Sequence, residues 1–190
     1  MAWFANALAL HKVDVPPTFV ETGAYLGDGI RSILQSRLFE TIHSIELSSR
    51  WVNHCRRRFS RYRAVHIHEG DSANVLQTLE LPKQPVLFYL DAHYSGGPTA
   101  GEDIDNGCPV LRELMCIANR GVPGDVIFVD DMRLMGKDQE SGVKDHTVYP
   151  LTRFDFRHAH EDAMRECFRG RSIRVWANCE DIDRLLIVLD

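Results

Sequence analysis

The chain of 190 residues lacks a long hydrophobic run, an excess of positive charge and a secretory leader pattern. Its apolar opening stretch, residues 1–10, is too short to span a bilayer and has no basic residues ahead of it, so we expect no membrane partner. The formal net charge of −5 argues against a nucleic-acid-binding protein. We interpret residues 1–17 as a helix and a linker that pack on the domain.

The cysteines indicate no disulfide framework, because their number is odd and the sequence has no C-x-x-C pair. This pattern favours a reduced, cytoplasmic protein. None stands beside an obvious activating base, so we expect core or surface thiols. The five positions are Cys55, Cys108, Cys116, Cys167 and Cys179.

An alternation of strand-like and helix-like segments is what the sequence does contain. Hydrophobic residues make up 44% and charged residues 26%, which is ordinary for one globular domain of this length. Alternation of this kind predicts βαβ units, with a parallel sheet and helices on both faces. The predicted strands are 18–22, 41–46, 64–69, 85–91 and 125–131, and the predicted helices between them are 27–39, 48–62, 72–79 and 108–121.

The end of the chain departs from this alternation. The segments 172–179 and 184–190 are strand-like, and only four residues separate them. A parallel crossover needs about a dozen residues or more, so this pair must be an antiparallel hairpin. The sequence therefore predicts an α/β fold whose sheet has seven strands, with the last strand antiparallel.

A glycine loop follows the first predicted strand and reads E21-T-G23-A-Y-L-G27-D-G29. It opens a helix at the carboxyl edge of the sheet, where open α/β sheets bind ligands. Glycines let the backbone turn tightly and approach a ligand, and the helix N-terminus directs free N–H groups there. The spacing differs from the dinucleotide fingerprint G-x-G-x-x-G. A tight turn without a ligand is the alternative interpretation.

Polar residues also end the second and third predicted strands. Glu46 can accept both hydroxyls of a ribose, or it can simply favour the dipole of the following helix. Asp71 and Ser72 can contact a ligand, or they can cap the following helix. Together with the loop, these residues fall on three successive strand ends along one edge.

This arrangement resembles the class I S-adenosylmethionine-dependent methyltransferases, in which an acid precedes the motif G-x-x-x-G-x-G. The resemblance covers about residues 18–190 and implies a Rossmann-like three-layer α/β/α sandwich. In that family an acid at the place of Asp71 reaches the adenine amino group. The resemblance thus implies S-adenosylmethionine as cofactor, bound by Glu21, Gly23, Gly27, Gly29, Glu46, Asp71 and Ser72.

The fourth and fifth predicted strands end in Asp91 and in the pair Asp130-Asp131. Carboxylates that converge in a poorly hydrated cleft repel one another, and a divalent cation relieves the conflict. Hard oxygen ligands suit Mg²⁺ or Ca²⁺. A simple strand-end turn is the alternative for the aspartate pair.

These strand ends resemble the metal-dependent macrocin O-methyltransferase-like branch of the family, which implies Asp91, Asp130 and Asp131 as Mg²⁺ ligands. The branch often reads D-G-D-H-S-Y after its fourth strand, whereas this chain reads D91-A-H93-Y-S95, one residue shorter. His93 is either the general base for an acceptor hydroxyl, helped by an ordinary pKa of about 6.5, or a residue that orients Asp91.

Three further segments complete the sequence-based interpretation. The glycine-rich segments 95–107 and 136–145 are expected to be mobile lids or surface loops. The basic run 50–63 is expected to be a helix with Trp51, Cys55 and Phe59 facing inward and arginines in solvent, which makes nucleic acid an unlikely partner.

The sequence therefore predicts a small cytoplasmic methyltransferase that uses S-adenosylmethionine, with Mg²⁺, to methylate a hydroxyl of a small molecule or sugar. Two alternatives stay open because a fold does not fix a function. One is a metal-dependent enzyme of another reaction, and the other is a non-catalytic module that binds a nucleoside or a protein partner. Homo-oligomerisation also stays open.

Overall fold

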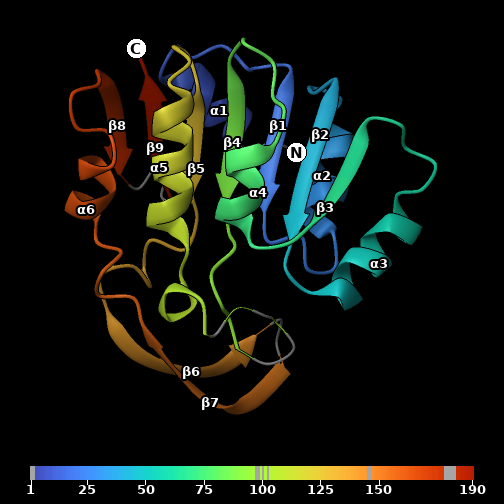
Figure 1. The fold of residues 1–190 in the computed structure, drawn as a ribbon, viewed down its shortest axis with the longest axis vertical. Coiled ribbons are helices and arrows are strands. Elements are labelled where there is room, and N and C mark those ends of the chain that lie inside the picture. The colour runs from blue at the N-terminus through green and yellow to red at the C-terminus, as the bar shows by residue number, and fades with distance from the viewer. Residues whose placement is uncertain (1–2, 97–98, 100, 102, 145–146, 178–182) are drawn as a thin grey trace.

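A seven-stranded sheet forms the middle layer of the protein (Figure 1). The computed structural model describes residues 3–96, 99, 101, 103–144, 147–177 and 183–190. The strand order is β3-β2-β1-β4-β5-β9-β8, with β9 antiparallel to β5 and β8 and the first five strands parallel. The strands are β1 (Thr18–Thr22), β2 (Thr41–Glu46), β3 (Val65–Glu69), β4 (Val86–Leu90), β5 (Val126–Val129), β8 (Ile173–Ala177) and β9 (Leu185–Leu189).

This topology confirms the predicted fold, including the closing hairpin. Residues 178 and 179 of the predicted strand 172–179 lie outside the described residues. The parallel register pairs Thr22 with Ile45 and Leu90, and Leu90 with Val129, so these strands end at nearly the same level. The residues that follow each strand are therefore held along one edge by the sheet itself.

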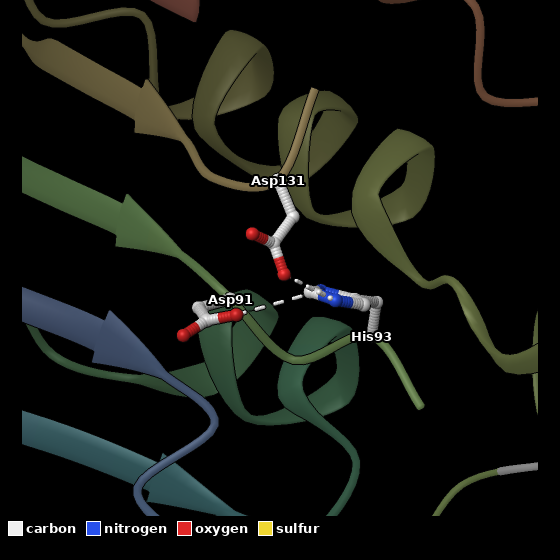
Figure 2. Close-up of side chains that lie close together, drawn as sticks. All are labelled: Asp91, His93 and Asp131. Atoms are coloured by element: carbon white, nitrogen blue, oxygen red, sulfur yellow. Dashed lines mark ion pairs between the residues drawn. The ribbon is translucent and has the colours of Figure 1, made fainter. Parts of the chain in front are cut away.

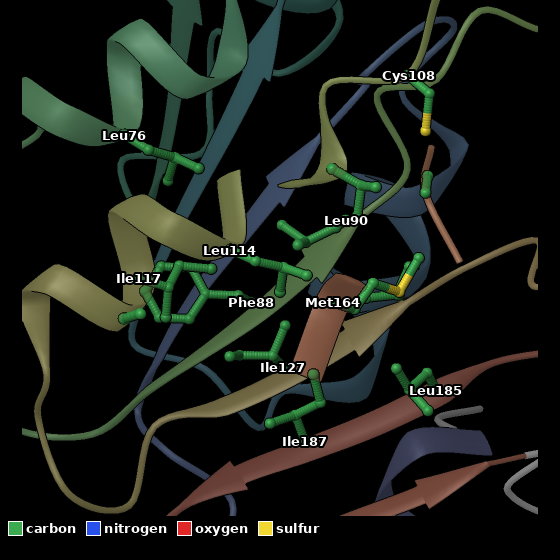
Figure 3. Packing of buried hydrophobic residues seen from close by; sticks show 14 of the residues in the cluster. Leu76, Phe88, Leu90, Cys108, Leu114, Ile117, Ile127, Met164, Leu185 and Ile187 are labelled. Atoms are coloured by element: carbon green, nitrogen blue, oxygen red, sulfur yellow. The ribbon is translucent and has the colours of Figure 1, made fainter. Parts of the chain in front are cut away.

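Six helices of the described chain cover the sheet in two layers. Alternate residues of β4 point to opposite faces: Leu87 packs with the first layer and Phe88 with the second. Figure 3 shows the core beneath the second layer, in which Leu114 and Met164 pack over Phe88. The first layer is α1 (Trp3–Leu10), α2 (Asp28–Ser36) and α3 (Ser49–Arg58), and the second is α4 (Ser72–Thr78), α5 (Val110–Arg120) and α6 (Glu161–Glu166).

The helix ends follow the sequence. Gly121 ends α5 in the left-handed region at φ 57°, and its N–H reaches the Ile117 carbonyl, as a C-cap glycine should. Of the two possible caps of α4, Asp71 rather than Ser72 is the cap, and it accepts a hydrogen bond from the Asn74 N–H at 2.9 Å. A carboxylate is the stronger acceptor for this orphan donor.

A two-stranded antiparallel sheet corrects the expectation of a loop over 136–145. It consists of β6 (Asp138–Lys144) and β7 (Thr147–Asp155). Arg153 Nε donates to Asp138 Oδ1 at 2.7 Å across the pair. In Figure 1 this hairpin lies beyond the carboxyl ends of the central strands. In the other expected loop, 95–107, residues 105–107 form a short 3₁₀ turn, and residues 97, 98, 100 and 102 lie outside the described residues.

The remaining expectations concern exposure. Among the described residues, no helix is both long enough and apolar enough to cross a membrane. The basic helix buries Trp51, Cys55 and Phe59, as its spacing predicted. Four cysteines are free thiols, at Cys55, Cys108, Cys116 and Cys167, whereas Cys179 lies outside the described residues.

Candidate active site

A cavity of about 520 Å³ lies at the carboxyl edge of the sheet. Its size falls in the usual range for small-molecule and cofactor sites. Gly27, Asp130 and Asp131 are not part of its lining. The expected site residues that do line it are Glu21, Gly23, Gly29, Glu46, Asp71, Ser72, Asp91 and His93.

Gly23 sits where two strand ends meet. Its φ is +85°, and its N–H donates to the Ile45 carbonyl at 2.9 Å. A Cβ at this position would lie 2.3 Å from the Asp91 carbonyl oxygen, well inside any tolerable contact. The backbone of the glycine loop therefore rests directly against the backbone that follows β4, and only glycine allows this.

The other two glycines of the motif make room for side chains. A Cβ on Gly27 would lie 2.6 Å from the Phe59 ring, and a Cβ on Gly29 would lie 2.5 Å from Oε2 of Glu21. Arg58 reaches over the loop, donates to the Leu26 carbonyl and pairs with Asp28. The glycine spacing thus has a packing cause in this chain, in addition to any role at the cavity.

Glu21 is a buried acid below the loop. Burial raises its pKa to about 8; a hydrogen bond from the Ser44 hydroxyl at 2.7 Å opposes this rise, and the charges of Asp91 and Glu46 add to it. The carboxyl is therefore protonated at neutral pH. A neutral acid here can donate one hydrogen bond as well as accept.

Glu46 is buried at the end of β2, and its two carboxylate oxygens each hold a backbone segment. Oε2 accepts from the Tyr25 N–H at 2.8 Å, and Oε1 accepts from the Ser48 N–H at 2.7 Å. A carboxylate has about four lone-pair sites, so two remain for a ligand in the cavity. The loop and the start of α3 therefore fix the direction in which this acid points.

Asp71 holds two helices together. Besides capping α4, its carboxylate binds Arg112 of α5 at 3.0 and 3.2 Å. Sequence reasoning missed Arg112, because an arginine within an amphipathic helix gives no sign of its partner 41 residues away. Ser72 is buried, and its side chain lies beside the buried carboxyl of Glu113.

A cluster of three side chains, Asp91, His93 and Asp131, lies at the ends of β4 and β5 (Figure 2). Nδ1 of His93 lies 3.4 Å from Oδ1 of Asp91, and Nε2 lies 3.0 Å from Oδ2 of Asp131. The ring of Phe156, just after the β6–β7 hairpin, meets the His93 ring edge-on at 5.9 Å. The His93 side chain is only 3% exposed, whereas that of Asp91 is 38% exposed. Asp91 thus presents its carboxylate to the cavity, with the imidazole behind it.

Asp130, expected to share this cluster, lies apart from it. Its carboxylate forms an ion pair at 2.9 Å with Arg184, the residue directly before β9, and accepts a hydrogen bond from the Tyr89 hydroxyl. The next residue, Asp131, has a left-handed backbone at φ 54°. This conformation, which aspartate tolerates better than most residues, directs the two carboxylates toward different partners.

Asp131 has a lowered pKa. Burial alone would raise its pKa, but the hydrogen bond and charge of His93, and then those of Arg133, lower it to about 2. The carboxylate therefore stays ionised throughout the physiological range.

The cluster offers one imidazole and two carboxylates whose ligand atoms all lie within 4.8 Å of one another. Carboxylates suit Mg²⁺ and Mn²⁺, whereas imidazole suits softer divalent cations. The set fits a cation that accepts both donor types, such as Mn²⁺, better than it fits Mg²⁺, which prefers oxygen.

No protein-family model and no curated protein sequence matches the chain. Solved structures do match it. The S-adenosylhomocysteine-bound methyltransferase PaMTH1 from Podospora anserina is 19% identical with a TM-score of 0.61, over 99% of this chain and 76% of that one. The O-methyltransferase TomG from Streptomyces achromogenes, in complex with S-adenosylmethionine, is 19% identical with a TM-score of 0.53, over 91% and 72%. The glycopeptide N-methyltransferase MtfA, complexed with the same cofactor, is 15% identical with a TM-score of 0.59, over 98% and 93%.

At these identities the likeness concerns the fold and leaves the acceptor atom open, since both O- and N-methyltransferases are among the matches. The chain has the Rossmann-like fold of the S-adenosylmethionine-dependent methyltransferases.

Proposed function

We propose that the protein is an S-adenosylmethionine-dependent methyltransferase that methylates a hydroxyl of a small molecule or sugar, assisted by a divalent cation. One observation carries the proposal. A single cavity connects the glycine loop and Glu46, where a nucleoside would lie, with Asp91 and His93, where an acceptor would lie. Both reactants of a methyl transfer thus have a place within one enclosure.

On the cofactor side, Glu46 would accept hydrogen bonds from the ribose hydroxyls, and Asp71 with Ser72 would lie by the adenine. Tyr25 and Trp51, whose rings meet at 4.8 Å, add aromatic surface to the same wall. The carboxylates around the cavity favour a cationic ligand, and a sulfonium is one.

On the acceptor side, we assign the contact with the hydroxyl to Asp91. Its carboxylate is the exposed member of the cluster, and both nitrogens of His93 face carboxylates, so His93 acts as a positioning residue. Bound S-adenosylmethionine would supply the methyl group to the acceptor oxygen with loss of its carbon–sulfur bond, and Asp91 would take the hydroxyl proton. The products are the methyl ether and neutral S-adenosylhomocysteine.

A divalent cation bound by Asp91, His93 and Asp131 would supply Lewis acidity that lowers the pKa of the acceptor hydroxyl. We extend the sequence-based Mg²⁺ hypothesis to Mn²⁺, because the ligand set includes an imidazole. The free thiols fit a cytoplasmic location.

Calorimetry with S-adenosylhomocysteine, with and without Mg²⁺ or Mn²⁺, tests both parts. We expect cofactor binding in wild-type protein, and cation binding that is lost in Asp131→Asn but retained in the matched control Asp130→Asn. Absence of S-adenosylhomocysteine binding would overturn the methyltransferase proposal. Cofactor binding without any cation binding would remove the metal and leave Asp91 and His93 as the acceptor-side groups.

A further inference from the structure

Three histidines gather on one face of the sheet, away from the active-site cavity. His43 lies on β2, and His66 and His68 lie on the edge strand β3. The register pairs His43 directly with His66, and His68 lies two residues after His66 on the same strand. All three side chains therefore lie on the same face of the sheet. His66 is exposed, and the other two are half-buried. Figure 1 shows β3 at the border of the sheet.

The His43 ring contacts both of the other rings. Nδ1 of His43 lies 3.0 Å from Nε2 of His68, and the His43 ring stacks on the His66 ring with centroids 5.1 Å apart. The His43 and His68 centroids are 5.2 Å apart. Among the described residues, no carboxylate forms an ion pair with any of the three. The charged neighbour is Arg56, whose guanidinium donates to the Ile67 carbonyl between His66 and His68.

Two facing ring nitrogens at this separation share one proton, since one imidazole donates and the other accepts. A cation can take the place of that proton. Two nitrogens bound to one tetrahedral Zn²⁺ at about 2.0–2.1 Å lie about 3.3 Å apart, so the rings need to separate by a few tenths of an ångström and to tilt until both lone pairs point at the cation.

We propose that His43, His66 and His68 form a second metal site, selective for zinc-like transition metals and distinct from the Asp91 cluster. Imidazole ligands suit Zn²⁺, Cu²⁺ and Ni²⁺ and do not suit Mg²⁺ or Ca²⁺. His43 and His68 supply the first two ligands in nearly their present positions. His66 supplies the third by rotating its exposed side chain, which costs little at the surface.

Zn²⁺ titration by calorimetry at pH 7.5 tests the proposal. We expect His43→Gln, His66→Gln and His68→Gln each to weaken one binding event at least about tenfold, since even loss of an outer-shell partner costs about 10–100-fold. The control His54→Gln, on α3, should retain that event. So should His93→Gln, which removes only binding at the Asp91 cluster.

Three results would overturn the proposal. The first is that wild-type protein binds no Zn²⁺. The second is that all Zn²⁺ binding disappears in His93→Gln, so that the Asp91 cluster accounts for it. The third is that the variants of the three histidines bind Zn²⁺ as wild type does. Circular dichroism establishes that each variant is folded, and exposed His66 gives a variant that leaves the buried part of the sheet untouched.

Discussion

Replacing Glu46 with alanine should damage cofactor binding and stability by separable amounts. The side chain accepts two backbone hydrogen bonds, from Tyr25 and from Ser48, and each bond to a charged acceptor contributes about 1.5–3 kcal/mol. Losing both should cost about 3 kcal/mol or more. For a domain of this size that corresponds to a fall in Tm of roughly 6–12 °C.

The binding loss comes on top of this. If Glu46 also accepts the ribose hydroxyls, Glu46→Ala should weaken S-adenosylhomocysteine binding by at least ~1.5 kcal/mol, or about tenfold in Kd. Glu69 provides a matched control, because it is the register partner of Glu46 on the next strand. Its carboxylate is exposed, accepts a hydrogen bond from the Ser49 hydroxyl and meets Arg56 at 3.6 Å, so Glu69→Ala should cost under about 1 kcal/mol and leave Kd unchanged.

The assay is calorimetry at a temperature well below the Tm of the variant, with circular dichroism on the same samples. A Kd equal to that of wild type, in a folded Glu46→Ala protein, would refute the ribose assignment. A lower Tm with unchanged Kd would leave Glu46 as a structural acid that holds the loop to α3.

Three further changes have distinct signatures. The pKa of Glu21 rises from its usual 4.5 to about 8 on folding, so the folded state holds a proton that the unfolded state releases, and stability falls as pH rises across that window. Glu21→Gln should flatten this slope in thermal melts from pH 5 to pH 8. An unchanged slope would contradict the burial argument. Asp125 is fully buried, accepts from the Val86 N–H at 2.9 Å and pairs with Arg120, so Asp125→Ala should cost about 3–5 kcal/mol in urea denaturation. Arg58→Gln, which releases the glycine loop, should lower the free energy of unfolding by about 1–2 kcal/mol. The exposed control Arg57→Gln should change it by no more than about 0.5 kcal/mol. Equal effects would show that Arg58, like Arg57, is only a solvated arginine.

The strand and helix pattern was predictable because the apolar spacing is regular throughout the sheet. The closing hairpin followed from a connection of four residues, a length that admits only antiparallel pairing. The positions of Glu46 and Asp91 at one edge followed equally, since parallel strands in register end together.

The hairpin β6–β7 was not predictable by the same reasoning. The run T147-V-Y-P-L-T-R-F-D155 carries β-branched and aromatic residues, but Pro150 within it argues against a strand of a larger sheet. In a two-stranded sheet every strand has a free edge, so proline is tolerated. The available signal was the strand propensity of residues 147–155, which had not been assigned to the main sheet.

The partners of the two aspartates after β5 were also out of reach. Sequence spacing places Asp130 and Asp131 together, yet the left-handed backbone of the second residue sends one to Arg184 and the other to His93. A single dihedral angle decides this, and no periodicity reports it.

The contact between Gly23 and the Asp91 carbonyl has a consequence for how such a protein can diversify. Because backbone touches backbone there, the spacing between the glycine loop and the Asp91 carboxylate is insulated from side-chain substitution. Under the proposed methyl transfer, a lineage that changes its acceptor must then do so in the segments that border this frame, above all in the hairpin that ends beside Phe156. Divergence among relatives should accordingly concentrate in residues 136–157, while the Gly23–Asp91 junction persists unchanged.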